Sequence, residues 1–481
     1  MQRNHATKAA ILASSLALAA ATATPASAQA GSAGTDQGSE RPARPAPNIL
    51  FVLADDLGWG DPSCYGNPDY LTPNLDQLAS QGTLFTSFYA AAPTCSPSRA
   101  AFMSGRFPSE LGIHGPLHVD QEDVGAEWLD PALPNLASAL GGAGYRTGHF
   151  GKWHLGAPAE GAPELSEYGF DSARIAKRWV GERSLWRTNR AGSSREIVDA
   201  ALEFIDTDDE RPFYAQLWML DPHAPLSTEV PRLESYAVFG PASGNPPGAK
   251  ALYAAHVGEL DVQIGRLMNA LSKRRLNRST IVIFASDNGP EVHEVRNASY
   301  SAAGSSGPFR GTKRSLYEGG LRVPLIVRWP GRVPAGRIER EAVVSAVDFL
   351  PTLARLGRAE LAGDVELDGE DVADVLFGAS RPRQTPLFYE SRVLQQGRFV
   401  DRSPSLGMRL GDLMLLLEPE GGRTELFDLG SDPVQLRNLA DADPERLEAL
   451  RTSALEWFAS LQPRQESDGL DLDPWPWVVG R

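Results

Sequence analysis

The sequence predicts an α/β fold, in which a large and mostly parallel sheet lies between layers of helices, followed by a small α+β domain. Two observations carry this prediction. Short apolar runs that stop at polar residues alternate with amphipathic helical segments across residues 48–378. From residue 379 to residue 481 the pattern changes to closely spaced strands and one helix. A chain of 481 residues is also long enough for one large domain and a smaller companion.

Five apolar runs predict the strands of the large sheet. They are short, of the sort seen in strands buried on both faces, and span residues 48–54, 145–150, 213–220, 280–286 and 324–329. Between them lie segments with apolar side chains at spacings of three and four, which predict helices over residues 72–82, 133–144, 195–206 and 251–274. This alternation predicts a parallel sheet that is covered on both faces.

The last hundred residues predict a different kind of domain. Three segments with short turns between them, residues 386–391, 407–419 and 423–429, predict antiparallel strands. Residues 444–462 then predict one amphipathic helix. We therefore expect an antiparallel sheet with a helix over residues 379–481.

The N-terminus has the pattern of an export signal. Arg3 and Lys8 precede the apolar run AAILASSLALAAA, and Ala26 and Ala28 then form an A-x-A cleavage pattern. The run is shorter than the roughly 20 residues of a membrane span, so we expect a signal peptide over residues 1–28 and no stable membrane anchor. Residues 29–47 are small, polar and proline-rich, which predicts a disordered linker. The expected location is a bacterial periplasm or the medium.

The overall charge restricts the partners. The formal net charge is -15 at pH 7, and a surface this acidic argues against a nucleic acid as a partner. An anionic substrate would need a local cluster of basic side chains.

Polar side chains follow four of the predicted strands. In an open parallel sheet, ligands bind beyond the carboxyl ends of the strands, and those ends carry Asp55, Asp56, Lys152, His154, His223, Asp287 and Asn288. Carboxylate and amide oxygens are hard ligands that suit Ca²⁺ or Mg²⁺ better than zinc. The two adjacent aspartates could instead be ordinary turn or cap residues, but the second acidic strand end favours a cation site.

Cys95 is one of only two cysteines, and it precedes Pro97 at the start of a predicted helix. A helix N-terminus lowers a thiol pKa, so a nucleophilic cysteine is one interpretation. A disulfide bridge to Cys64 is the other. A thiolate beside a hard divalent cation is a poor chemical match, which favours an oxygen-based group at this position.

The segment CSPSR, residues 95–99, resembles the C-x-P-S-R signature of type I sulfatases. Other segments resemble the same family in family order: PNILFVLADDLGWGD, GYRTGHFGKWHLG, SDNGPE, GTKRSLYEGGLRVPLIVRWPG and ELFDLGSDPVQLRNLA. The resemblance covers most of residues 48–440. It is closest to the arylsulfatase A and N-acetylgalactosamine-6-sulfatase branch of the alkaline phosphatase superfamily, and it implies that superfamily's fold.

The resemblance implies a modified nucleophile and a metal. A maturation enzyme would oxidise Cys95 to formylglycine, whose hydrate attacks sulfur through one hydroxyl and expels sulfate through the other. The implied cation is Ca²⁺, with Mg²⁺ as the alternative, and the implied ligands are Asp55, Asp56, Asp287, Asn288 and the modified Cys95.

The remaining implied roles belong to charged side chains. Arg99 would steady the nucleophile, while Lys152 and Lys313 would bind the sulfate oxygens. His154 would take a proton during release of sulfate, and His223 would protonate the departing alcohol.

The predicted function is hydrolysis of a sulfate ester, on a sulfated polysaccharide, an oligosaccharide or an aryl sulfate. One alternative is a formylglycine-dependent phosphonate or phosphodiester hydrolase of the same superfamily. An alternative of another class is an inactive carbohydrate-binding protein in which Cys95 stays unmodified or bridges Cys64.

Overall fold

The computed structural model describes residues 45–117, 126–156, 161–175, 190–240, 248–291, 301–361, 365–393, 395 and 399–461. The predicted signal peptide and nearly all of the predicted linker lie outside these residues. Within the described part of the chain, no helix combines the length and the apolar character that a bilayer crossing requires.

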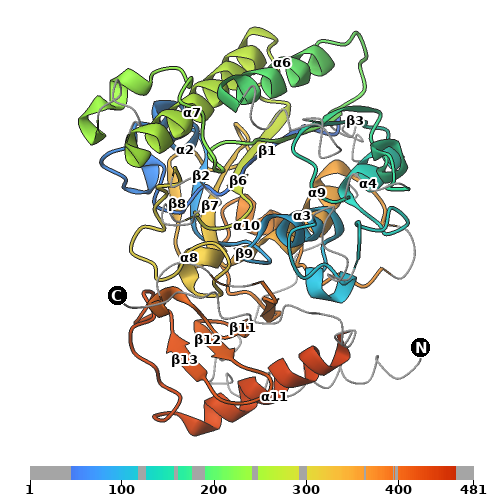
Figure 1. Ribbon diagram of the computed structural model, residues 1–481. Coiled ribbons are helices and arrows are strands. Elements are labelled where there is room, and N and C mark those ends of the chain that lie inside the picture. The colour runs from blue at the N-terminus through green and yellow to red at the C-terminus, as the bar shows by residue number, and fades with distance from the viewer. Residues whose placement is uncertain are drawn as a thin grey trace, which may run out of the picture. The chain divides into compact units, whose positions relative to one another are not determined.

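A mixed sheet of nine strands forms the centre of the larger part (Figure 1), counted over the described residues, with the order β4-β3-β5-β1-β6-β7-β2-β8 and with β9 beside β2. Neighbouring strands are parallel except where β7 meets β6 and β2. The mostly parallel sheet is therefore confirmed. The strands are β1 (Asn48–Ala54), β2 (Thr83–Tyr89), β3 (Arg146–Gly151), β4 (Ser172–Ile175), β5 (Phe213–Trp218), β6 (Thr280–Ser286), β7 (Arg322–Arg328), β8 (Arg337–Glu339) and β9 (Val344–Ser345).

Strand β1 shows why the sheet is covered on both faces. Successive side chains of a strand point to opposite faces. Ile49, Phe51 and Leu53 belong to one buried apolar cluster, whereas Leu50 and Val52 belong to the other. The first cluster includes side chains of α3 (Cys95–Ser104), α4 (Leu136–Gly142) and α9 (Phe349–Gly357), and the second includes side chains of α2 (Pro73–Ser80), α6 (Ser193–Ile205) and α7 (Ala249–Lys273). The predicted helical layers are confirmed.

Strand β2 was absent from the predicted set of strands. Its sequence, TLFTSFY, is interrupted by hydroxyl side chains and lacks the uninterrupted apolar character of β1. It pairs antiparallel with β7 and continues toward the helix α3. The antiparallel direction of β7 could not be predicted from its sequence either. An apolar run indicates that a strand is buried, but it does not indicate in which direction the strand runs.

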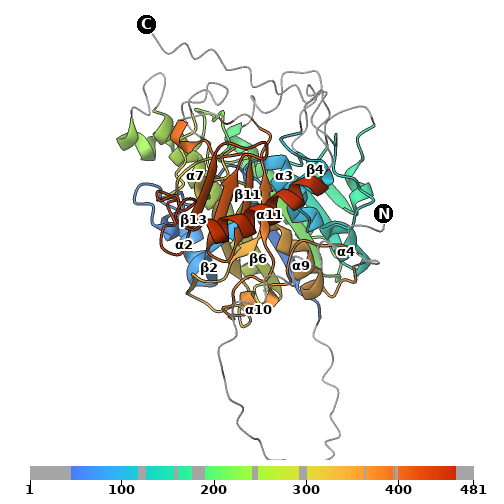
Figure 2. The same ribbon diagram turned by 90° about the horizontal axis from the view of Figure 1, so that it is seen from below.

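A second sheet lies toward the C-terminus (Figure 2) and contains β10 (Leu387–Glu390), β11 (Leu406–Leu410), β12 (Leu413–Leu417) and β13 (Thr424–Asp428), all antiparallel. Helix α11 (Pro444–Ser460) contacts β11 and β12, and Leu450, Ala454 and Trp457 are its buried side chains. The predicted antiparallel sheet with one helix is thus confirmed. The boundary between residues 378 and 379 stays a prediction.

The two sheets are joined by polar contacts as well as by apolar packing. Tyr317 donates from its hydroxyl to Glu425 at 2.7 Å, and Trp457 donates from Nε1 to Glu110 at 2.9 Å. Side chains of both sheets also belong to one buried apolar cluster. The C-terminal sheet and its helix therefore pack against the larger part of the molecule.

Candidate active site

The carboxyl ends of four adjacent strands bring the predicted site residues together. The strand order β3-β5-β1-β6 places the ends that carry Lys152, His223, Asp55 with Asp56, and Asp287 with Asn288 side by side. Cys95 is the first residue of α3, and Lys313 lies in the segment before β7. These residues come from six separate stretches of the chain, so the sheet topology creates the cluster.

Three buried ion pairs organise this cluster. Lys152 Nζ lies 2.9 and 2.8 Å from the two carboxylate oxygens of Asp55. Lys313 Nζ donates to Asp56 Oδ2 at 2.7 Å. Arg99 donates to Asp287 Oδ2 from Nε at 2.9 Å and from Nη2 at 2.7 Å.

Arg99 is fixed from two further sides. Its Nη1 donates to the backbone carbonyl of Lys152 at 3.0 Å, and its guanidinium lies over the ring of Trp218, 5.0 Å from the centroid. The side chain is fully buried. An arginine held in this way presents a rigid positive charge one helical turn from Cys95.

Burial and neighbouring charge act against each other on the three aspartates. Burial disfavours the charged form of Asp55, but Lys152 and other nearby cations outweigh it and hold the pKa of Asp55 well below its usual range. The pKa of Asp56 is also lowered, because Lys313 opposes burial there. Burial raises the pKa of Asp287 to about 6 against the lowering effect of Arg99. Asp55 and Asp56 are therefore ionised at neutral pH.

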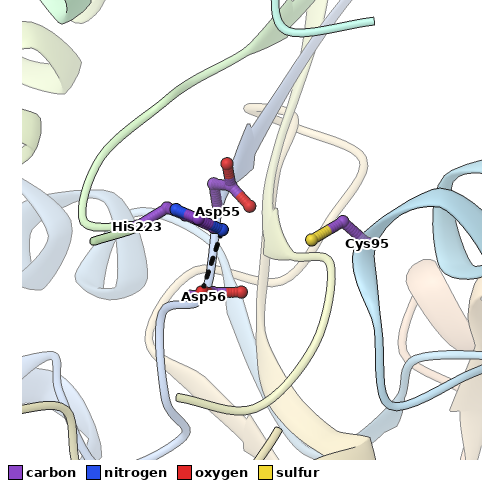
Figure 3. Close-up of side chains that lie close together, drawn as sticks. All are labelled: Asp55, Asp56, Cys95 and His223. Atoms are coloured by element: carbon purple, nitrogen blue, oxygen red, sulfur yellow. Dashed lines mark ion pairs between the residues drawn. The ribbon is translucent and has the colours of Figure 1, made fainter. Parts of the chain in front are cut away.

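The carboxylate and amide oxygens of this cluster suit a hard cation, whereas the sulfur of Cys95 and the nitrogen of His223 are softer ligands. One ligand atom each from Asp55, Asp56, Cys95 and His223 lies within 4.8 Å of the others (Figure 3). Asn288 donates from Nδ2 to Asp56 Oδ1 at 2.7 Å, while its buried Oδ1 has no hydrogen-bond partner among the described residues. An orphaned carbonyl oxygen beside two carboxylates is a ready ligand for Ca²⁺ or Mg²⁺.

Asp287 lies next to this group without being one of its four members. Its Oδ1 accepts from the backbone amide of Asp56 at 3.1 Å, and its Oδ2 accepts from Arg99. Asp56 itself has a backbone φ of 62°, a left-handed conformation that costs a non-glycine residue free energy. The cluster is thus held by backbone as well as by side-chain contacts.

Cys95 is 2% exposed, and burial raises the pKa of its thiol to about 11. An unmodified thiol would therefore be protonated at neutral pH and would be a weak nucleophile. Cys95 and Cys64 are both free cysteines, so the alternative of a bridge between them is wrong.

The two predicted histidines differ in their surroundings. His223 Nε2 lies 3.5 Å from Asp56 Oδ2, and burial lowers the pKa of His223 to about 3. The imidazole is consequently neutral before an anion arrives. His154 is half-buried, lies two residues after Lys152 and has a left-handed backbone with φ of 57°.

Two polar clusters near the site were not assigned from the sequence. Arg314, next to Lys313, donates from Nη1 to both carboxylate oxygens of Glu291 at 2.8 and 2.7 Å. His114 Nδ1 lies 2.8 Å from Glu390 at the end of β10. The only sequence signal for Arg314 was its position beside Lys313.

The fold and the site together define a class. The fold is alkaline phosphatase-like, and the two buried lysines and the candidate cation site at the carboxyl edge of its sheet suit hydrolysis of an anionic ester. The structure of the phosphonate monoester hydrolase of Agrobacterium radiobacter has this fold, with a TM-score of 0.60 and 22% identity over 85% of this chain and 96% of that one.

Within this class the chain belongs to the sulfatase family, because the family's sequence profile matches residues 47–359. A profile of the N-sulphoglucosamine sulphohydrolase C-terminal region matches residues 307–456. The protein is therefore a sulfuric ester hydrolase.

Relatives and solved structures agree with this membership. Steryl-sulfatase of Mus musculus is 32% identical over 88% of this chain and 84% of its own length. Arylsulfatase A of Homo sapiens is 32% identical over 89% of this chain and 92% of its own. The structure of Ps i-CgsB in complex with k-i-k-neocarrahexaose has a TM-score of 0.73 and 25% identity, and covers 90% of this chain and 98% of that chain.

Proposed function

We propose that this protein removes sulfate from a sulfated carbohydrate or an aryl sulfate, using formylglycine at position 95 and a bound Ca²⁺, with Mg²⁺ as the alternative ion. The observation that carries the proposal is the position of Cys95 at the N-terminus of α3, within 4.8 Å of ligand atoms of Asp55, Asp56 and His223. The signal pattern of residues 1–28 supports export to a bacterial periplasm or the medium.

The environment of Cys95 favours an oxygen nucleophile over sulfur. A thiol with a pKa near 11 offers little thiolate at neutral pH. A hydrated aldehyde at this position supplies one hydroxyl to attack sulfur and a second whose deprotonation expels sulfate. A formylglycine-generating enzyme is consequently a required partner during synthesis.

The ion would be held by Asp55, Asp56, Asp287, Asn288 and an oxygen at position 95. It would lower the pKa of the attacking hydroxyl and polarise a sulfate oxygen. The side-chain Oδ1 of Asn288 has no hydrogen-bond partner among the described residues, which supports this ligand set, as does the negative charge of Asp55 and Asp56.

The chain's own cations have separate tasks. Lys152 and Lys313 are buried at the two aspartates and can bind the sulfate oxygens as charge builds on them. Arg99 orients the nucleophile from its fixed position over Trp218.

Proton transfers fall to the two histidines. His154 would take the proton of the second hydroxyl when sulfate leaves. His223 is neutral in the ligand-free protein, and a bound sulfate would favour its imidazolium through added negative charge. A protonated His223 would then donate to the departing alcohol oxygen.

A carbohydrate substrate is supported by the likeness to Ps i-CgsB, whose structure was solved with k-i-k-neocarrahexaose. N-acetylgalactosamine-6-sulfatase of Canis lupus familiaris, 34% identical over 71% of this chain and 68% of its own, adds a relative named for a sulfated sugar.

The test compares sulfate release by wild type, Cys95→Ala and Cys64→Ala, after co-expression with a formylglycine-generating enzyme. Wild type and Cys64→Ala should release sulfate from 4-nitrophenyl sulfate or a sulfated oligosaccharide panel, whereas Cys95→Ala should not. Mass spectrometry of the peptide with residue 95 should show an aldehyde in the active samples. Full activity of Cys95→Ala would refute the nucleophile, and faster turnover of a 4-nitrophenyl phosphate diester would favour the phosphodiesterase alternative.

A further inference from the structure

Arg314 is a buried cation beside the candidate active site that has no role in the proposed reaction. Its backbone amide donates to the carbonyl of Pro93 at 2.8 Å, two residues before Cys95. The preceding residue, Lys313, binds Asp56. The Arg314 side chain is 12% exposed and its partner Glu291 is 7% exposed. Arg314 is therefore attached to the same cluster that would bind the sulfate group.

The guanidinium of Arg314 has N–H donors that are not used in its ion pair with Glu291. Nη1 alone makes both hydrogen bonds to Glu291. Nε and Nη2 make no hydrogen bond to any described residue, and neither is among the fully buried unsatisfied atoms. Two of its three nitrogens thus face accessible space, and a planar guanidinium with two open nitrogens suits a carboxylate or a sulfate.

The backbone of Arg314 also points to a use for its side chain. Its φ is 76°, in the left-handed region where glycine carries no steric penalty and arginine does. Asp56 and His154, two other residues of the site, have the same unusual conformation. Strain at such a position persists where the side chain contributes something that glycine lacks.

The Arg314 guanidinium keeps its positive charge in this partly buried position. Burial lowers the pKa of Arg314, but Glu291 first, and then Asp56 and Cys95, raise it above its usual value. The side chain stays charged, and Glu291 contacts this charge at Nη1 only.

We propose that Arg314 is a specificity-determining residue that binds a second anionic group of the substrate, a carboxylate or a second sulfate near the scissile sulfate ester. This inference rests on the proposed function and narrows its substrate to carbohydrates with at least two anionic groups. The second anion receives hydrogen bonds from Nε and Nη2 of Arg314, while Glu291 keeps the guanidinium in place through Nη1.

The test measures binding and not turnover, so that it stands even where sulfate release fails. Calorimetry with the full-length Cys95→Ala protein compares three disaccharides that share one sulfated hexosamine. The neighbouring unit carries a uronate carboxylate, the same unit reduced to the alcohol, or a second sulfate. An anionic probe should bind about tenfold more tightly than the alcohol, because a hydrogen bond to a charged group contributes that much.

In Cys95→Ala with Arg314→Gln the three dissociation constants should become nearly equal. Preference for the carboxylate alone identifies a uronate as the second anion, and preference for both anions identifies charge as the criterion. Equal binding of all three probes by the Cys95→Ala protein, or no binding of either anionic probe, would overturn the assignment.

Glu291→Gln is the control for a purely structural role. It removes the negative charge of the ion pair but leaves an amide oxygen that can still accept from Nη1 and hold the guanidinium in place, so the preference for the anionic probes should persist or increase. If Glu291→Gln abolishes the preference as Arg314→Gln does, Arg314 only maintains the local structure and the proposal is wrong. Failure of wild type to release sulfate from any ester would contradict the proposed function without changing these binding ratios.

Discussion

We expect Cys95 to be oxidised before helix α3 folds, and Phe102 provides the way to test this. Every residue of α3 from Cys95 to Ser104 is buried. The ring of Phe102 lies 5.3 Å from that of Phe51, 6.2 Å from that of Phe88 and 4.6 Å from that of Phe349, measured between centroids. These partners come from strands β1 and β2 and from α9, so α3 cannot open without disrupting the core.

Phe102→Ala should lower the free energy of unfolding by about 3–5 kcal/mol, as expected for a fully buried phenylalanine. Phe399→Ala is the matched control, since that ring is 77% exposed and its removal should cost less than about 0.5 kcal/mol. Urea unfolding of the two variants and wild type, all produced without the maturation enzyme, measures the difference.

The same proteins then test access to Cys95. A formylglycine-generating enzyme added to the folded chains should oxidise Phe102→Ala at least about a hundredfold faster than wild type, since 1.4 kcal/mol is a factor of ten. A peptide that spans residues 90–105 should be oxidised fastest of all. If folded wild type is oxidised as fast as the peptide, burial does not limit maturation and the reasoning fails.

Three further predictions concern single side chains. Calcium at a hundred times its dissociation constant should stabilise wild type by about 2.7 kcal/mol, and Asn288→Ala should lose most of this gain in thermal unfolding at the same calcium concentration. Lys313→Gln should lower kcat for 4-nitrophenyl sulfate by about 10²–10³, whereas the surface variant Lys250→Gln should match wild type. Burial alone would raise the pKa of Glu390, but His114 and Arg392 hold it at about 2 instead of 4.5, so its stabilising charge is present above about pH 4.5 and lost toward pH 2. Over that range wild type should lose about 3 kcal/mol more stability than Glu390→Gln in urea unfolding, and parallel losses would contradict the ion pair.

The convergence of the polar residues at the strand ends could be predicted from the sequence. Parallel strands end at a common edge, so Asp55, Lys152, His223 and Asp287 had to converge once the strands were found. The pairing of each cation with a particular aspartate could not be predicted. It depends on the order β3-β5-β1-β6, and apolar runs carry no information on which strands are neighbours.

The contact between the C-terminal sheet and His114 could not be predicted from the sequence either. Glu390 lies 276 residues from His114 in the chain, and their 2.8 Å contact exists only because β10 is placed beside the first part of the fold. The backbone conformation of Arg314 could not be predicted for a different reason. Its left-handed backbone is unusual for arginine, and no residue pattern around it indicates that conformation.

The pairing of lysines with carboxylates predicts that divalent-ion and sulfate binding are linked. Asp55 and Asp56 hold the ammonium groups of Lys152 and Lys313, and the same carboxylates are the candidate ligands of the ion. Ion binding offsets their negative charge, which leaves both lysines more attractive to an anion. Inorganic sulfate should therefore bind at least about tenfold more weakly after chelation, and by reciprocity sulfate should tighten calcium binding by the same factor. Equal sulfate affinity with and without the ion, measured by calorimetry on Cys95→Ala, would show that the lysines act independently of the carboxylates they contact.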